Sequence, residues 1–307
     1  WRSFFTVALP LARPAIMAGL ALALMETLND LGTVEYFGVN TFTTGIYRTW
    51  LGMGERSAAA QLAAFLMIFV LILIVLERRS RSAAQYYERS SSIKKIVPFQ
   101  LNPGHSLGAL IACLLPVIFG FIIPGGYLLQ LTLNNLDSSF DADFRDLAQH
   151  SFTLASITAI AAMVISLLMA YGQRLEPNWL MKTAVRISAM GYAIPGSVIA
   201  VGVLIPVAGL DNLIDHWMRS TFNISTGLLL SGTIFSLIFA YLVRFLAVGF
   251  GSVESSLNKI APSLDDASRS LGYGSTSTLW NIHTPLMSGG LLTSAMLVFV
   301  DVMKELP

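Results

Sequence analysis

The sequence predicts an all-α fold, a polytopic transmembrane helical bundle made of two parallel repeats. Hydrophobic residues make up 54% of the 307 residues and charged residues only 12%, whereas an ordinary soluble domain carries about 25% charged residues. Several separate apolar runs are each long enough to cross a bilayer. In addition, a segment near the start of the chain recurs near its end.

Composition also limits the partners and cofactors that we expect. The net charge is only +1, so the chain lacks the strongly basic character of nucleic-acid-binding domains, and no nucleic acid is expected as a partner. Cys113 is the only cysteine and stands inside an apolar run, which excludes a disulfide framework and a cysteine-based metal site. The expected surroundings are a lipid bilayer, and no cofactor is expected.

Seven runs are candidates for membrane spans, because roughly 20 apolar residues at about 1.5 Å each cross the hydrocarbon layer. They are residues 15–34, 57–76, 107–129, 151–171, 189–210, 227–248, and 288 to the end. The loops after the second, fourth and sixth runs hold most of the Lys and Arg residues, among them Arg78, Lys182 and Lys259. Because such residues are retained on the cytoplasmic side, we place these three loops inside.

An internal repeat appears when the sequence is shifted by 275 residues, which lays residues 9–32 over 284–307. Three pairs then coincide: Pro10 with Pro285, Glu26 with Asp301, and Asp30 with Glu305. Six crossings separate the two starts, so both copies enter from the cytoplasm and the repeat is parallel. We therefore expect the C-terminal part of a first repeat in 1–85, a cytoplasmic linker in 86–104, and a second repeat, truncated at its end, in 105–307.

The cytoplasmic segment before the last span contains a spaced motif. Asp266, Ala267 and Ser268 are followed by Gly272 and then by Ile282 and Pro285. Pro262 can open a short helix whose dipole suits an acid in its first turns, and Gly272 can end that helix with a positive φ. The pattern predicts a compact helical knob, and the first copy keeps only its tail, at Pro10.

This motif resembles the cytoplasmic loop of binding-protein-dependent ABC importer permeases, although Asp266, Ser268 and Thr284 replace the usual Glu, Ala and Leu. The resemblance implies that the six motif residues and Pro10 form an ATPase-coupling loop. It also implies a multi-pass protein of the bacterial inner membrane, two copies of an ABC ATPase subunit, and a periplasmic substrate-binding protein as partners. No phosphate-binding G-x-x-x-x-G-K-[ST] is present, so the chain is not expected to be an enzyme.

Residues 26–50 and 301–307 resemble the fused two-repeat permeases of ferric-iron importers, which implies ferric iron as the transported ion. Permeases for sulfate, molybdate, thiamine or polyamines share the knob and stay open as alternatives. An ion-coupled secondary transporter is a further alternative, although the knob has no obvious use there. An intramembrane metalloprotease would need H-E-x-x-H, which the sequence lacks; His105, His150, His216 and His283 are interpreted as interfacial polar residues.

Four acids inside the repeated spans suggest a substrate pathway: Glu26, Asp30, Asp301 and Glu305. Each pair is spaced i, i+4 and is expected on one helix face. Because a charge at mid-membrane costs roughly 2.5 to 3.5 kcal/mol, the acids should face a bundle interior and form a ring that passes ferric ion without binding it tightly. Alternatively, they pair with Lys304 or cap a helix broken near Gly32. Gly191 and residues 192–198 indicate either a broken helix or close packing.

Overall fold

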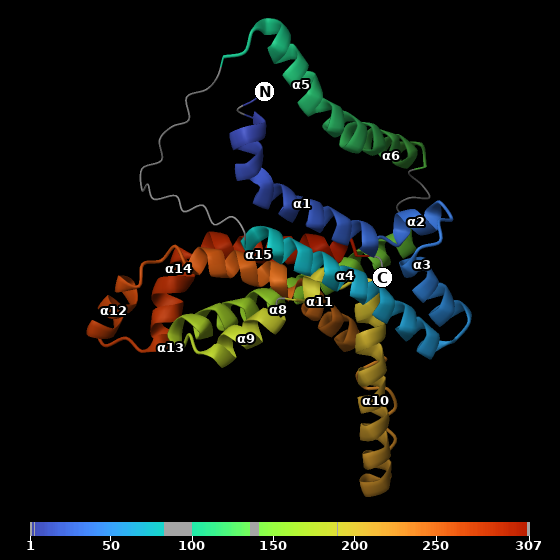
Figure 1. Ribbon diagram of the computed structural model, residues 1–307. Helices are drawn as coiled ribbons and strands as arrows, with labels where there is room; N and C mark the ends of the chain where they lie inside the picture. The colour runs from blue at the N-terminus through green and yellow to red at the C-terminus, as the bar shows by residue number, and fades with distance from the viewer. Residues whose placement is uncertain (1, 3, 83–99, 136–140, 189, 306–307) are drawn as a thin grey trace. The chain divides into compact units, whose positions relative to one another are not determined.

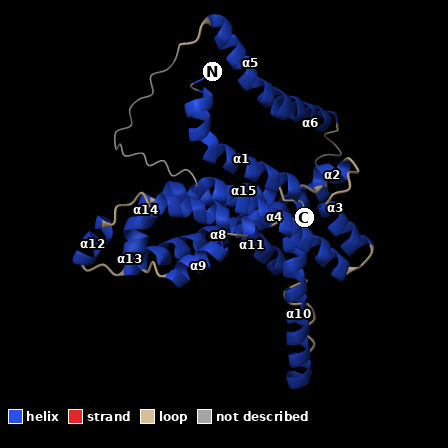
Figure 2. Cartoon of the chain, viewed as in Figure 1, coloured by secondary structure: helices blue, strands red, loops and turns tan. Residues whose placement is uncertain are grey.

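The computed structural model describes all residues except 1, 3, 83–99, 136–140, 189 and 306–307. The described residues form helices joined by loops, without a strand (Figures 1 and 2). The predicted all-α polytopic fold is confirmed. The chain forms two compact units: one comprises Trp1–Gln85 with Phe152–Pro307, and the other comprises Tyr86–Ser151.

Within the described residues, five helical segments are long and apolar enough to cross a membrane, and a bent pair adds a sixth. They account for six of the seven expected spans. The bent pair turns by 78° between Ser275–Leu286 and Ser288–Met303. The five segments are α4 (Arg56–Ser82), the run α5 (Pro103–Val117), η3 (Ile118–Ile122) and α6 (Ile123–Asn134), then α8 (Ala142–Leu175), α10 (Gly196–Phe222) and α11 (Ile234–Leu257).

The first expected span, residues 15–34, corresponds to α1 (Leu9–Asn29), a helix of 21 residues. It ends five residues earlier than expected, because the chain becomes extended at Asp30. Three short elements follow before α4: α2 (Gly32–Tyr36), α3 (Phe42–Tyr47) and η2 (Arg48–Gly52). Thr41 begins α3 with a capping box that it forms with Thr44.

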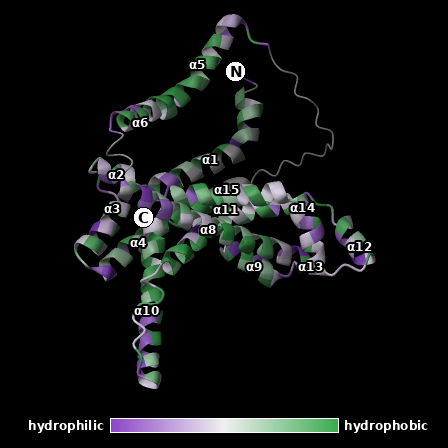
Figure 3. Cartoon of the chain, turned by 180° about the vertical axis from the view of Figure 1, so that it is seen from behind, coloured by the Kyte–Doolittle hydropathy of each residue, from purple (hydrophilic) through white to green (hydrophobic). Residues whose placement is uncertain are grey.

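The unit Tyr86–Ser151 contains the run from α5 to α6, and none of the side chains described in this run is buried. Figure 3 shows these helices mostly in the colours of hydrophobic residues. Such an exposed apolar surface is typical of a helix that faces lipid. Residues 86–99 of the predicted linker 86–104 lie outside the described residues. Helix α5 begins inside this linker, at Pro103. The repeat boundaries therefore stay a prediction.

In the larger unit, α15 (Ser288–Met303) packs along α11, and α8 packs against both at small residues. A Cβ on Gly249 would lie 3.0 Å from Ser294 Oγ and 3.1 Å from Ser166 Oγ, so these three helices meet with little room between their backbones. A second close approach joins Gly290 and Ser256. Two apolar clusters join α8, α11 and α15. A third cluster joins α3, α4 and α10.

The fifth and sixth spans differ from the prediction. The fifth begins at Gly196 because the chain before it breaks: a short 3-10 turn, η4 (Gly191–Ala193), precedes an extended Ile194. It then continues to Phe222, so Asp211 and Asp215 lie in α10, beyond the end of the span predicted for residues 189–210. Both carboxylates accept backbone hydrogen bonds from residues 226–231, which fold back along α10. The sixth span consequently begins later, at Ile234.

Candidate functional site

The predicted knob has the helix ends that the sequence indicated. Helix α12 (Ser263–Ser270) begins after Pro262, and Gly272 follows it with φ +83°. The N–H of Gly272 donates to Arg269 O, and the N–H of Tyr273 donates to Ser268 O. These two bonds form a Schellman motif, which satisfies the last carbonyls of α12 and turns the chain sharply. The chain continues through α13 (Ser275–Thr278), η5 (Leu279–His283) and α14 (Thr284–Leu286).

Asp265 fixes the knob to the helical bundle. Its Oδ2 accepts a hydrogen bond of 2.8 Å from Arg174 Nε, and its Oδ1 lies 2.6 Å from His283 Nε2. The same arginine also donates to the carbonyls of Leu257 and Ile260, near the end of α11. Burial works against the ionisation of Asp265, but the hydrogen bonds from Arg174 and His283 outweigh it and hold the pKa of this carboxyl below its usual value.

The predicted coupling residues do not all face the same way. Asp266, Ala267 and Pro285 are exposed, whereas Ile282 is half-buried. Ser268 is buried, and its Oγ lies 2.6 Å from Thr278 Oγ1. Its small size therefore suits packing inside the knob. The exposed large residues Leu271 and Trp280 lie in the same segment, and Pro10 of the first copy is exposed on α1.

The second part of the site is a polar junction where the ends of α1 and α15 meet the break before α10. Both helices end before the second acid of each pair, at Asn29 and at Met303. The expectation that each i, i+4 pair shares one helix face is therefore wrong. In the first copy the reason is visible, because Asp30 Oδ1 accepts the N–H of Thr33 at the start of α2. This bond lies at the helix break where the sequence left a capping role open, although Leu31 stands at the N-cap of α2 and no side chain caps that helix.

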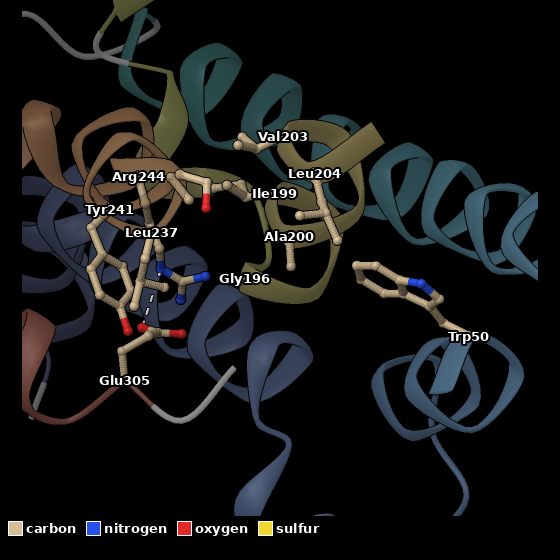
Figure 4. Close-up of a pocket in the computed structure, with 12 residues that line it drawn as sticks. Trp50, Gly196, Ile199, Ala200, Val203, Leu204, Leu237, Tyr241, Arg244 and Glu305 are labelled. Atoms are coloured by element: carbon tan, nitrogen blue, oxygen red, sulfur yellow. Dashed lines mark ion pairs between the residues drawn. The ribbon is translucent and has the colours of Figure 1, made fainter. Parts of the chain in front are cut away.

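A buried ion pair connects α11 with the end of α15 in the junction. Arg244 Nε lies 3.3 Å from Glu305 Oε2, and each side chain is only 7% exposed. Figure 4 shows the two side chains facing each other across a dashed line. Arg244 Nη1 also donates to Asn29 Oδ1 in the first copy, at 3.3 Å. The same oxygen accepts the N–H of Gly196 at 2.7 Å. The side-chain amide of Asn29 therefore joins the predicted first repeat to the predicted second repeat.

Two further bonds complete the junction. Tyr192 OH donates to Glu26 Oε1 at 3.1 Å, which ties the broken segment to the first copy. Lys304 Nζ lies 3.0 Å from Asp301 Oδ1, which is the other pairing that the sequence left open. A cavity of about 280 Å³ is lined by three of the four acids, Glu26, Asp30 and Glu305, together with Lys304. Asp301 does not line this cavity, although its ion-pair partner Lys304 does.

Gly196 and Gly191 show why this segment is rich in glycine. A Cβ on Gly196 would overlap Arg244 Nη1 and would lie 2.8 Å from Glu305 Oε1, so a larger residue would displace the ends of the paired side chains. A Cβ on Gly191 would overlap the carbonyl of Val243 on α11. The structure thus combines both sequence interpretations, a broken helix and close packing. A mainly apolar pocket of about 160 Å³ lies between Trp50 and the ion pair (Figure 4).

Sequence reasoning missed Arg244, Asn29, Asp265 and Arg174 as parts of the site. A signal for Arg244 was present, since it is the one charged residue in the otherwise uncharged run 234–253, and a charge inside a span usually has a partner. His283 was interpreted as interfacial but is fully buried. Among the described residues, no group of three His, Cys, Asp or Glu side chains is placed to hold a metal ion.

Residues 1–82 match the family of binding-protein-dependent transport system inner membrane components. Over 99% of its length the chain is 25% identical to the ferric transport system permease protein FbpB of Actinobacillus pleuropneumoniae and 23% identical to the Fe(3+)-transport system permease protein FbpB 2 of Haemophilus influenzae. Over 82 residues it is 33% identical to the molybdenum transport system permease protein ModB of H. influenzae. The resemblance to binding-protein-dependent permeases, and to those of ferric systems, is confirmed.

The chain spans about half the length of these ferric relatives, namely 44% of the first and 58% of the second. No solved structure matches the chain significantly. Together, the apolar helices and the similarity to transport permeases indicate a multi-pass membrane protein.

Proposed function

We propose that the chain forms the transmembrane pathway of an ATP-binding-cassette importer in the bacterial inner membrane and that a separate ATPase subunit hydrolyses ATP. The observation that supports this most is the knob, a rigid helical element held to the bundle by Arg174 and Asp265, with an exposed outer face. Such an element suits a partner that pushes on it from the cytoplasm. We expect two ATPase copies and a periplasmic binding protein as partners.

Ferric iron is the substrate that we propose, delivered by the binding protein. Two relatives that match along 99% of the chain are named as ferric transport permeases. In the junction, acids from both copies line one cavity, and hard, highly charged cations prefer carboxylate oxygens. Arg244 and Lys304 each neutralise one of the four acids. An excess of two negative charges remains, which attracts a cation without enclosing it.

The junction also suggests how the pathway closes. Asn29 and Glu26 of the first copy are hydrogen-bonded to Gly196 and Tyr192 of the second. Both bonds cross from one copy to the other, so an ion can pass between the copies only after they break or exchange partners. We propose that the knob transmits the movement of the ATPase to this contact and that the described arrangement is the closed one.

Neutral amides test the role of the carboxylates. We expect Glu26→Gln with Asp301→Asn, in the full-length importer with its ATPase and binding protein, to lower ferric-ion uptake about tenfold, equivalent to roughly 1.4 kcal/mol of barrier. The matched control is Asp143→Asn with Asp146→Asn, which removes the same charge from exposed positions on α8. Equal uptake by both double variants, with equal amounts in the membrane, would refute a pathway role for the acids.

A permease for an oxyanion is the second candidate, because the chain is 33% identical to a molybdenum transport permease over 82 residues. In that case Arg244 and Lys304, not the acids, would contact the substrate. Uptake of labelled molybdate and ferric ion by the same membranes separates the two candidates. Molybdate uptake that survives the Glu26→Gln and Asp301→Asn substitutions, without ferric-ion uptake by the unmodified protein, would establish the oxyanion.

A further inference from the structure

Helix α9 (Trp179–Ser188) carries a surface that neither the pathway nor the knob uses. It starts after a link of three residues from the end of α8 at Leu175, and such a link spans at most about 14 Å. The loop after this span lies on the cytoplasmic side by its Lys and Arg content. Because α8 is a candidate membrane span, α9 begins at the cytoplasmic surface of the membrane.

The position of α9 is fixed by one buried face. Asn178 Oδ1 accepts the N–H of Met181 at 2.8 Å and caps the helix. Val185 is buried in the apolar cluster with Tyr171 of α8 and Leu257 of α11, and Met181 packs against the same cluster. Figure 1 shows α9 lying beside α8. The helix is therefore held within one or two turns of the cytoplasmic ends of two spans.

The remaining surface of α9 has two parts. Trp179, Leu180 and Ile187 are 71%, 60% and 65% exposed, and at 100° per residue they occupy one arc of the helix. Lys182 and Arg186 are exposed and lie four residues apart, on the other side of Trp179. Among the described residues, neither cation forms an ion pair.

We propose that α9 binds anionic phospholipid at the cytoplasmic surface of the membrane. Lys182 and Arg186 contact the phosphate groups, and Leu180 and Ile187 lie against the first acyl carbons. A tryptophan at the boundary between them is typical of interfacial helices. Lipid fits better than a soluble anion, because a free phosphate would leave the apolar arc in water. It also fits better than a protein, because α9 follows a candidate membrane span after a link of only three residues.

The proposal has a consequence for the pathway. Ser188 ends α9, and Tyr192, which binds Glu26, follows four residues later. Headgroup binding on α9 would therefore restrict the movement of the segment around Tyr192, which closes the junction. The inference itself depends on the membrane location of the chain, not on the transported solute.

Tryptophan quenching tests the proposal in nanodiscs that contain both phosphatidylcholine and phosphatidylglycerol and hold the full chain. Either phosphatidylglycerol or phosphatidylcholine carries brominated acyl chains, and the difference between the unmodified protein and Trp179→Phe isolates the signal of Trp179. We expect stronger quenching by the brominated phosphatidylglycerol. Removing both cations, by Lys182→Gln with Arg186→Gln, should reduce this preference by up to about 30-fold, or about fivefold for each charge.

The matched control is Lys259→Gln with Arg269→Gln, which removes two exposed cations from the knob region and should keep the preference. An unchanged melting temperature shows that each variant is folded. Equal quenching by the two lipids in the unmodified protein, or a preference that survives the loss of Lys182 and Arg186, would overturn the proposal. Protection of Trp179 only after an ATPase subunit is added would instead assign the surface to a protein partner.

Discussion

The knob and the junction are both held by charged side chains, but their bonds connect different parts of the molecule. In the knob, Arg174, Asp265 and His283 all lie within residues 105–307, the predicted second repeat. In the junction, Asn29 and Glu26 of the first copy bond to the second. If the predicted repeats are the structural units, the knob is an internal element of one repeat, whereas the junction is a contact between the two.

This difference indicates how a movement can travel through the protein. An element fixed within one copy can move together with α8 and α11 and lose none of its own bonds. A contact between copies must change when one copy moves relative to the other. The knob is therefore suited to receive a force, and the junction is suited to respond to it.

The largest effect is expected from Arg244→Leu, because it leaves the carboxylate of Glu305 buried without its cation. Removing one partner of a buried ion pair costs about 3 to 5 kcal/mol. We expect a much lower melting temperature in detergent and less protein in the membrane. Adding Glu305→Leu removes the uncompensated charge and should recover most of the stability, since apolar replacements of buried pairs are often neutral.

The same variants test whether the two regions are independent. Hydrogen exchange of residues 263–286 should be unchanged in the Arg244→Leu, Glu305→Leu double variant, because no bond of the knob is altered. Faster exchange there, in a protein that melts like the unmodified one, would contradict the distinction between an internal element and a contact. Full stability of Arg244→Leu alone would show that the ion pair does not hold the junction.

A smaller and more local effect is expected from Asp265→Asn. The substitution weakens charge-assisted hydrogen bonds to Arg174 and His283, which are worth about 1.5 to 3 kcal/mol each. Hydrogen exchange within residues 263–286 should become faster at neutral pH, while the junction and the membrane spans stay protected. Asp266→Asn is the control, because that carboxylate is exposed and its nearest cation, Arg269, lies 3.9 Å away.

The effect of Asp265 should depend on pH in a defined direction. Its folded pKa is lowered, so its contribution to stability is fully present above the unfolded pKa of about 3.9 and disappears as the pH falls through the folded value. After correction for intrinsic exchange rates, the unmodified protein and Asp265→Asn should differ at neutral pH and converge in acid below about pH 4. A difference that is constant over this range would exclude the ionised carboxylate as its cause.

The sequence predicted the elements whose cause is local. The apolar runs identified the spans, and Pro262 with Gly272 identified both ends of α12, because caps and breaks depend on nearby residues. It did not predict that Asp265, and not its neighbour Asp266, binds Arg174, which lies 91 residues away. Nor did it predict the helix ends at Asn29 and Met303. Those depend on the packing of the two copies, which single-sequence periodicity does not contain.

The smallest structural effect is expected from Asp266→Lys, and its functional effect should be large. The Asp266 side chain is 77% exposed, and among the described residues its carboxylate forms an ion pair only with Arg269 of the same helix. Reversing its charge should therefore leave the melting temperature and the knob's hydrogen exchange nearly unchanged. The reversal does oppose the dipole at the start of α12 and changes the outer face that we assign to the ATPase. We expect the ATPase to co-purify poorly with this variant and ferric-ion uptake to fall with it.

Ser270→Lys places the same charge one helical turn further on, at an exposed position near the end of α12 where a cation suits the dipole. If both lysine variants retain the ATPase equally well, the face around Asp266 is not the docking surface. If only Asp266→Lys loses it in a protein of normal stability, a residue that does nothing for the fold is needed for the partner. The knob would then divide its two acids by role, Asp265 holding the element to the bundle and Asp266 meeting the subunit that drives it.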